Sequence, residues 1–279
     1  MTNTKDSMRP QKHPYLPVED YEHRAQALCE FLKLVVLDVS RHTLNTRQLI
    51  LRNALARASV GLRSIFRLYE LEDYQGCWIL NRCLLDRVFH IYNLVDEGTF
   101  DQFESWSFVQ QYNLRNRTRS IPEFRDRLNL EFFRDPEHHK QRYRQLTENP
   151  PSWNRPKPET VARNRGLRFL YTLGYDYGSM MVHPMADDGQ QDFYLVTGFA
   201  NRQVDLDQRV VLHNSIAVSA FIGNEVMAEI GFVWRRPATE FLHDLGDGLN
   251  SGDQKYESTL KRVKAFPPRY AIGEPLPSR

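Results

Sequence analysis

Several features that mark well-known protein chemistries are scarce or missing in this chain of 279 residues. It has only three cysteines, Cys29, Cys77 and Cys83, and no two of them form a CxxC pair. An odd number of thiols without such a pair argues against a disulfide framework and against a cysteine-based zinc site. Each cysteine lies in an apolar helical pattern, so we expect buried thiols in a reducing compartment and place the protein in the cytoplasm.

Long hydrophobic runs are also lacking. Residues 1–17 are polar and contain several prolines, without the apolar stretch of a secretory signal peptide, and we expect a disordered lead there. The longest uncharged run, 210–224, is interrupted by His213, Asn214 and Ser215 and is too short to span a bilayer. We therefore expect no association with a membrane.

The short motifs of several enzyme classes do not occur. The chain has no HExxH, GxSxG, GxxxxGK[ST] or GxGxxG, and its paired His138 and His139 lack metal-ligand spacing on one helix face. These absences argue against a zinc protease, a serine hydrolase with a nucleophile elbow, a P-loop enzyme and a dinucleotide-binding domain. We expect neither a metal nor a cofactor.

Net charge is only +2, but the charge is unevenly distributed. Residues 115–168 contain fourteen Arg or Lys against seven Asp or Glu, and arginine greatly outnumbers lysine in the whole chain. The planar arginine fork binds two phosphate oxygens at once, so nucleic acid or a nucleotide is a candidate partner. The alternative is a solvated face in an arginine-rich composition. The candidate anion-binding residues are Arg115, Arg117, Arg119, Arg163 and Arg165.

Apolar residues recur at helical spacing along most of the chain. The pattern predicts helices over 18–44, from an N-cap at Asn45 or Thr46 to about 72, and over 73–95. Weaker patterns predict further helices over 100–112, 121–133, 135–145 and 159–182. Four prolines within 149–158 predict a loop. The run 204–234 is apolar nearly all round, as expected of an enclosed helix, and is expected to be the longest.

Helices without convincing strands predict an all-α fold, an antiparallel bundle with a long buried C-terminal helix. We expect a single helical domain over 18–235. Residues 236–279 contain five prolines and are expected to be a mostly irregular tail. A homodimer is a candidate assembly.

Two segments place polar side chains where a helix would normally present its core. Arg82, Asp86 and His90 are spaced four residues apart and form one ridge, and we expect Arg82 and Asp86 to pair inside the bundle, away from solvent. About a hundred residues later, the other segment ends at Pro184, which fixes the end of its helix. Its candidate residues are Tyr175, Tyr177, Ser179 and His183.

The order and spacing of these residues resemble a bacterial family of unknown function, domain of unknown function 5677. The resemblance covers about 54–234 and pairs an R-x-L-L-[E/D] helix with a later Y-x-x-x-S-x-x-V-H-P helix end. Asp86 stands where a glutamate is more usual, which shortens the reach of the carboxylate. The resemblance implies an intracellular helical protein and no established activity. The matching residues are Arg82, Leu84, Leu85 and Asp86, then Tyr175, Ser179, Val182 and His183.

A looser likeness is to the HEPN helical nucleases, which cut RNA with an arginine, a polar residue, a short spacer and a histidine at a dimer interface. Arg134 and His139 have that spacing, with Asp135 in the polar position. The likeness implies that His139 would activate a ribose 2′-hydroxyl while Arg134 would steady the phosphate. This segment is polar on every side and contains Pro136, unlike the packed helical pair of that superfamily.

These observations lead to two competing functional hypotheses. In the first, Arg82, Asp86, Tyr177, Ser179 and His183 line a polar cleft for an anionic or nucleotide-like ligand, with RNA cleavage in defence or stress as a candidate activity. In the second, the protein is a non-enzymatic interaction module, and the same residues form a structural network. The first hypothesis predicts that His183 lies within reach of Arg82.

Overall fold

The computed structural model describes residues 15–40, 44–123, 135–183, 207–230 and 234–266, with 186, 189, 193 and 196–198. Its secondary structure over these ranges is helical, which confirms the predicted all-α fold. The elements in chain order are α1 (Val18–Val39), α2 (Thr46–Glu70), α3 (Tyr74–Glu97), α4 (Phe100–Ser120), α5 (Glu137–Glu148), α6 (Pro158–Asn164), α7 (Arg168–Leu170), the π-helix η3 (Tyr171–Asp176), α8 (Tyr177–Met180), α10 (Arg209–Glu229), α11 (Arg235–Ser251) and α12 (Lys255–Ala265).

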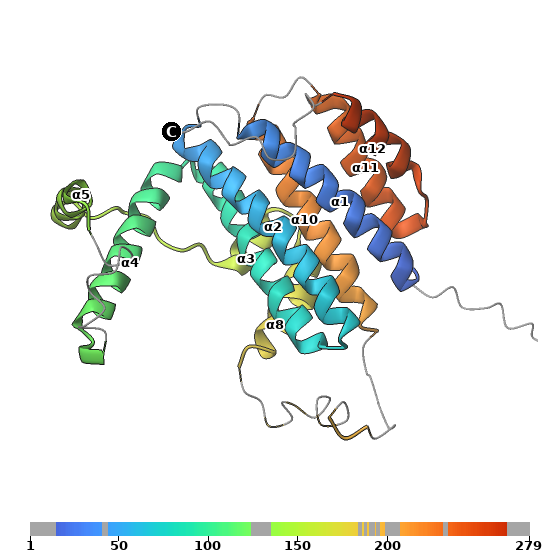
Figure 1. The fold of residues 1–279 in the computed structure, drawn as a ribbon, viewed down its shortest axis with the longest axis horizontal. Helices are drawn as coiled ribbons and strands as arrows, with labels where there is room; N and C mark the ends of the chain where they lie inside the picture. The colour runs from blue at the N-terminus through green and yellow to red at the C-terminus, as the bar shows by residue number, and fades with distance from the viewer. Residues whose placement is uncertain are drawn as a thin grey trace, which may run out of the picture.

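Helices α1, α2, α3 and α10 lie side by side and form the central bundle (Figure 1). Helices α2 and α3 are antiparallel. Near the α2–α3 turn, the Cys77 thiol donates to the carbonyl of Ile65, and farther away Gly61 lies against Leu84. Because only a few residues separate each of the first three helices from the next along the chain, neighbouring helices alternate in direction, as predicted.

The starts of α2 and α3 are set by side-chain caps. Asn45 and Gln48 form a reciprocal capping box at the start of α2, so the predicted N-cap is confirmed. Asp73 accepts from the amide of Gly76 at 2.7 Å and caps α3. Gly98 ends α3 with a left-handed φ of 65°, a conformation that glycine adopts without steric cost.

Helix α10 is the most enclosed helix of the bundle. It runs from Arg209 to Glu229 rather than over the whole predicted range, and at 21 residues it is shorter than the 25-residue α2, so the expectation that it is the longest was wrong. Its length and composition would allow it to cross a membrane, but 67% of the relevant window is buried inside the protein. That burial accounts for its apolar surface, because it packs against α1, α2, α3 and α11.

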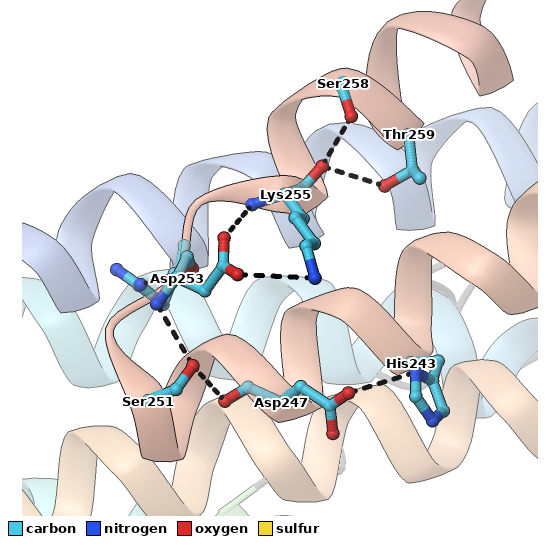
Figure 2. Close-up of polar contacts among 8 residues, drawn as sticks. His243, Asp247, Ser251, Asp253, Lys255, Ser258 and Thr259 are labelled. Atoms are coloured by element: carbon cyan, nitrogen blue, oxygen red, sulfur yellow. Dashed lines mark hydrogen bonds and ion pairs between the residues drawn. The ribbon is translucent and has the colours of Figure 1, made fainter.

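The prediction of a mostly irregular tail from residue 236 is wrong for most of the segment that the structure describes. Helices α11 and α12 form a hairpin beside α1, and Phe241, Leu245 and Val263 are fully buried in the common core (Figure 1). The turn between them is held by polar contacts shown in Figure 2. Asp253 accepts from the Lys255 amide at 2.9 Å, and its own amide donates to Ser251 Oγ at 3.2 Å.

Proline and glycine caused this error. Pro237 lies in the first turn of α11, where a missing amide hydrogen leaves no hydrogen bond unmade. Gly248 lies inside α11, and only glycine fits there. An added Cβ would come within 2.5 Å of the Asp253 carbonyl oxygen. The fully buried Arg24 of α1 donates to that same carbonyl at 2.9 Å and lies over the Tyr256 ring, which ties the hairpin to the bundle.

Helices α4 and α5 pair with each other to one side of the central bundle (Figure 1). We call α4, α5 and Asp135 the arm. The rings of Tyr112 and Tyr143 stack across the two helices, with centroids 4.1 Å apart. At the base of the arm, Phe103 and Trp106 pack against Trp153 in the proline-rich loop 149–157, which contains no helix, as predicted. This contact brings the loop close to α3.

Candidate functional site

The segment 159–182, predicted as a single helix, is divided into short pieces. Gly166 adopts a left-handed φ of 69° after α6, and α7 then leads into the six-residue π-helix η3 and the short α8. A π-helical turn inside a helix is rare and is frequent at functional sites. This turn places Tyr171, Tyr175 and Ser179 along the side of α3.

Two glycines allow η3 and α8 to approach α3 unusually closely. A Cβ at Gly178 would lie 2.8 Å from both the Trp78 carbonyl oxygen and the Arg82 Cβ. A Cβ at Gly174 would collide with Leu85 and lie 3.3 Å from Asn81 Oδ1. The close approach puts side chains of η3 and α8 within hydrogen-bond distance of Arg82.

Arg82 is the centre of a polar cluster between α3 and the η3–α8 segment. Its Nε donates to Ser179 Oγ at 2.8 Å, Nη1 to Asp86 Oδ2 at 2.9 Å and Nη2 to Tyr175 Oη at 3.1 Å. The guanidinium carbon also lies 4.7 Å from the centroid of the Tyr175 ring. Three side chains therefore hold this guanidinium in one position.

The pairing of Arg82 with Asp86 is confirmed, but the expected exclusion from solvent is wrong. The Arg82 side chain is 25% exposed and that of Asp86 is 28% exposed. The η3–α8 segment covers part of the pair, and about a quarter of each side chain stays exposed. A ligand in solution can therefore reach both charges.

Two tyrosines form an aromatic wall beside Arg82. The rings of Tyr171 and Tyr175 stack with centroids 5.5 Å apart and an interplanar angle of 14°. Burial, followed by a hydrogen bond to Asp176, raises the pKa of Tyr171 to about 12. Burial and the nearby Asp86 carboxylate raise the pKa of Tyr175 as well. Both phenols are therefore protonated near neutral pH and act as hydrogen-bond donors.

The third member of the ridge, His90, lies under the proline-rich loop. Its ring stacks on Trp153 with centroids 5.3 Å apart and an interplanar angle of 17°. Its Nε2 and the Nε1 of Trp153 are both buried without a hydrogen-bond partner in the described part of the chain. Burial and the positive charge of Arg155 lower the pKa of His90, so the imidazole is neutral near pH 7.

Arg155 adds a second positive charge at the edge of the cluster. It is exposed, and it lies close enough to lower the pKa of both His90 and Tyr175. No carboxylate among the described residues forms an ion pair with it. The cluster therefore comprises two guanidinium groups, one carboxylate, one neutral phenol and one serine hydroxyl. We call Arg82, Asp86, Tyr175, Ser179 and Arg155 the Arg82 cluster.

The structure does not bring together all the residues predicted for the cleft. Arg82, Asp86 and Ser179 meet as predicted. Tyr177 packs its ring against Trp78 instead, with centroids 4.7 Å apart. His183 is exposed at a bend beyond the end of α8, and none of the described contacts of Arg82 involves it. Its proximity to Arg82 stays a prediction.

The alternative pair, Arg134 and His139, is not seen as a pair. Arg134 lies outside the described residues. His139 is half-buried on α5, where its ring meets the edge of Phe108 with centroids 5.6 Å apart. It therefore packs against α4, within the arm.

The predicted anion-binding arginines are largely paired with carboxylates. Arg115 and Arg119 both bind Asp135, whose side chain is only 3% exposed, and the two guanidinium groups lower the pKa of that carboxyl. Arg165 donates to Asp96 at 3.2 Å and covers the Tyr92 ring. Arg117 and Arg163 are exposed. The positive charge counted in this region is thus partly neutralised by folding.

The site predicted from sequence did not include Arg155 and gave His90 no role. The sequence does indicate His90, since it continues the four-residue spacing of Arg82 and Asp86. Nothing in the sequence indicates Arg155, because only the packing of Trp153 brings its loop to the cluster. Across the described ranges, no group of three or more His, Cys, Asp or Glu is arranged to hold a metal ion.

Comparison with known protein families gives a match. The model of a family of unknown function, DUF5677, matches residues 48–194. The chain belongs to this family. The matched region contains every member of the Arg82 cluster, from α3 to α8. No curated protein and no solved structure matches. The likeness to HEPN nucleases gains no support from these comparisons.

The buried His90 predicts a pH-dependent stability. Because its pKa is lowered in the folded state, the unfolded chain binds more protons at mildly acidic pH, and the free energy of unfolding should fall as pH drops below about 6.5. Urea denaturation of His90→Phe from about pH 7.5 to about 5.5 should show a weaker fall than wild type. His213, whose pKa burial also lowers, accounts for a remaining slope. An unchanged slope in His90→Phe would contradict a buried neutral His90.

Proposed function

We propose that the protein binds a small phosphate-bearing ligand at the Arg82 cluster. The observation that supports this most is the guanidinium of Arg82, which is held by three side chains and still 25% exposed. A guanidinium has five N–H donors, and the described bonds use three of them. Two donors remain for a ligand.

The charge balance of the cluster favours an anion. Arg82 and Arg155 together carry two positive charges against one on Asp86, and His90 is neutral near pH 7. Arginine binds phosphate through paired, charge-assisted hydrogen bonds. The hydroxyl of Tyr175 accepts from Arg82 and hydrogen-bonds with Asp86, so it helps to hold both charged groups in place.

Preorganisation also supports ligand binding. Bonds to Ser179, Asp86 and Tyr175 fix Arg82 before any ligand arrives, so little side-chain entropy is lost on binding. Asp86 keeps the guanidinium oriented, while Arg155 is unpaired with any described carboxylate and free to meet the ligand. Asp86 would thus position Arg82, and Arg155 would bind the ligand directly.

Two other hypotheses lead to different results. If the cluster is only a structural network in an interaction module, phosphate compounds should not bind to it. RNA cleavage stays a prediction from sequence, because it needs a base beside the phosphate and no histidine is among the described partners of Arg82.

The proposal predicts that Arg155→Gln weakens phosphate binding without unfolding the protein. The probes are inorganic phosphate and adenosine monophosphate, measured by calorimetry and by the shift in melting temperature. Loss of one charge-assisted contact should weaken binding by about ten- to a hundredfold. Arg155 is exposed and outside the described hydrogen bonds, so the melting temperature without ligand should not change.

Arg144→Gln is the matched control. Arg144 is exposed on α5, away from the cluster, and the substitution removes the same charge. The proposal requires Arg144→Gln to bind like wild type. Equal weakening by both variants, or no binding of either probe to wild type, would support the structural network instead.

A further inference from the structure

His90 is connected to the Arg82 cluster along its own helix. It follows Asp86 by one turn of α3, and the Asp86 carboxylate accepts from Arg82 Nη1 at 2.9 Å. The His90 ring also donates a hydrogen bond to the backbone carbonyl of Asp86, which holds the ring against this turn. The imidazole and the ion pair therefore lie on one ridge of α3.

The proline-rich loop 149–157 connects His90 to the cluster from the other side. Trp153 is only 5% exposed and stacks on the imidazole with ring centroids 5.3 Å apart. Arg155 is two residues further along the same loop, and its charge acts on both His90 and Tyr175. His90 therefore lies beside the guanidinium group that we expect to meet the ligand.

One nitrogen of His90 can take up a proton without disturbing the cluster. Nε2 is buried and has no hydrogen-bond partner in the described part of the chain, so the bond to the Asp86 carbonyl comes from Nδ1. In the neutral ring the proton is therefore on Nδ1, and Nε2 carries the lone pair. Protonation of Nε2 adds a positive charge and breaks none of the side-chain bonds of Arg82.

Burial and three charged side chains decide whether His90 takes up that proton. Burial opposes the imidazolium most strongly, followed by the charge of Arg155, and Arg87 on α3 also opposes it. The carboxylate of Asp86 favours it. Helix α4 presents the apolar ring of Phe103 to the imidazole, with centroids 5.5 Å apart. The opposing effects are larger, so the pKa of His90 is lowered in the protein without ligand.

We propose that anion binding at the Arg82 cluster is coupled to proton uptake by His90, so that the site binds its ligand more tightly as pH falls. This inference rests on the proposed function. An anion bound by Arg155 places negative charge near His90 and offsets the positive charge that opposes its protonation. Coupling is reciprocal, so if the bound anion favours the imidazolium, the imidazolium favours the bound anion by the same factor. The site would thus respond to mild acidification.

The test measures sulfate binding by isothermal titration calorimetry from about pH 7.5 to about pH 5.5. Sulfate keeps its two negative charges over this range, whereas a phosphate monoester titrates near pH 6 and would add its own pH dependence. Wild type should bind sulfate about two- to tenfold more tightly at the lower pH, because one pKa unit corresponds to a factor of ten. Heats measured in buffers of different ionisation enthalpy should show proton uptake on binding.

The variant His90→Phe keeps an aromatic ring against Trp153 and removes the proton acceptor. It should bind sulfate with equal affinity at both ends of the pH range and take up no proton. His213→Phe is the matched control, because burial lowers the pKa of His213 as well, but its ring lies between Tyr15 and Tyr21. The proposal requires His213→Phe to keep the pH dependence of wild type.

The coupling and the proposed function can fail separately. Equal sulfate affinity of wild type at both pH values, or an undiminished pH dependence in His90→Phe, would overturn the coupling and leave phosphate binding in place. Absence of sulfate binding at every pH would also overturn the coupling, and phosphate binding to wild type and Arg155→Gln would then decide on the proposed function. Proton uptake by wild type tests the coupling even if His90→Phe does not fold.

Discussion

Replacing Arg82 by alanine is expected to lower the free energy of unfolding by about 2–4 kcal/mol. The substitution removes three side-chain hydrogen bonds, one of them to the Asp86 carboxylate. It also removes the guanidinium from the face of the Tyr175 ring, so the η3–α8 segment loses its main polar connection to α3. Partial exposure of the pair keeps the estimate at the lower end for breaking a charged contact.

Urea denaturation followed by circular dichroism measures this effect. Arg87→Ala is the control, because the described side-chain bond of Arg87 is to the Cys83 carbonyl within the same helix, and it should cost less than about 1 kcal/mol. The double variant Arg82→Ala/Asp86→Ala should be less destabilised than the sum of the two single variants, since each partner is no longer left alone. A wild-type midpoint for Arg82→Ala would show that the network does not hold η3 and α8.

The parts of the fold that were predictable are those with strong local signals. The stripe of Leu51, Leu55 and Leu62 and the capping residue Asn45 sufficed for α2, because both depend on residues close in sequence. Arg82 with Asp86 was singled out by four-residue spacing, and Tyr175 with Ser179 by the polar segment before Pro184 and by the family pattern. That these pairs would meet followed from the cost of burying polar groups without partners.

The parts that failed depend on contacts between distant segments. Nothing near Arg115 and Arg119 in the sequence shows that both would share Asp135, so the region seemed more positive than the folded arm is. The hairpin of α11 and α12 was missed because glycine and proline usually interrupt helices. Only glycine fits at position 248, because an added Cβ would come within 2.5 Å of the Asp253 carbonyl oxygen, and that carbonyl is bound by Arg24 of the distant α1.

Stability and binding are carried by different residues of the Arg82 cluster. Arg82, Ser179 and Tyr175 join α3 to η3 and α8, and their loss should be seen first in unfolding. Arg155 reaches the cluster from a loop anchored by Trp153 and makes no described side-chain bond, so its loss should be seen only in ligand binding. Comparing Arg82→Ala with Arg155→Gln therefore separates the two contributions.

The close packing of α8 on α3 predicts that Gly178→Ala lowers the free energy of unfolding by about 1–3 kcal/mol. The added methyl would lie 2.8 Å from the carbonyl oxygen of Trp78, and a backbone atom inside α3 cannot move aside as a flexible side chain could. Gly178 has an ordinary helical environment otherwise, so alanine alone would favour the helix. The predicted loss therefore reports the contact with α3.

Gly246→Ala is the matched control, since Gly246 lies inside α11 and an added Cβ would meet nothing within 4 Å. This variant should be stabilised by up to about 1 kcal/mol, because alanine loses less backbone entropy than glycine in a helix. Opposite signs for the two variants in the same urea titration would establish the close approach at Gly178. Because that approach positions Ser179 against Arg82, Gly178→Ala should also weaken phosphate binding, whereas Gly246→Ala should not. Stabilisation by both substitutions would mean that α8 does not pack against α3 as tightly as described.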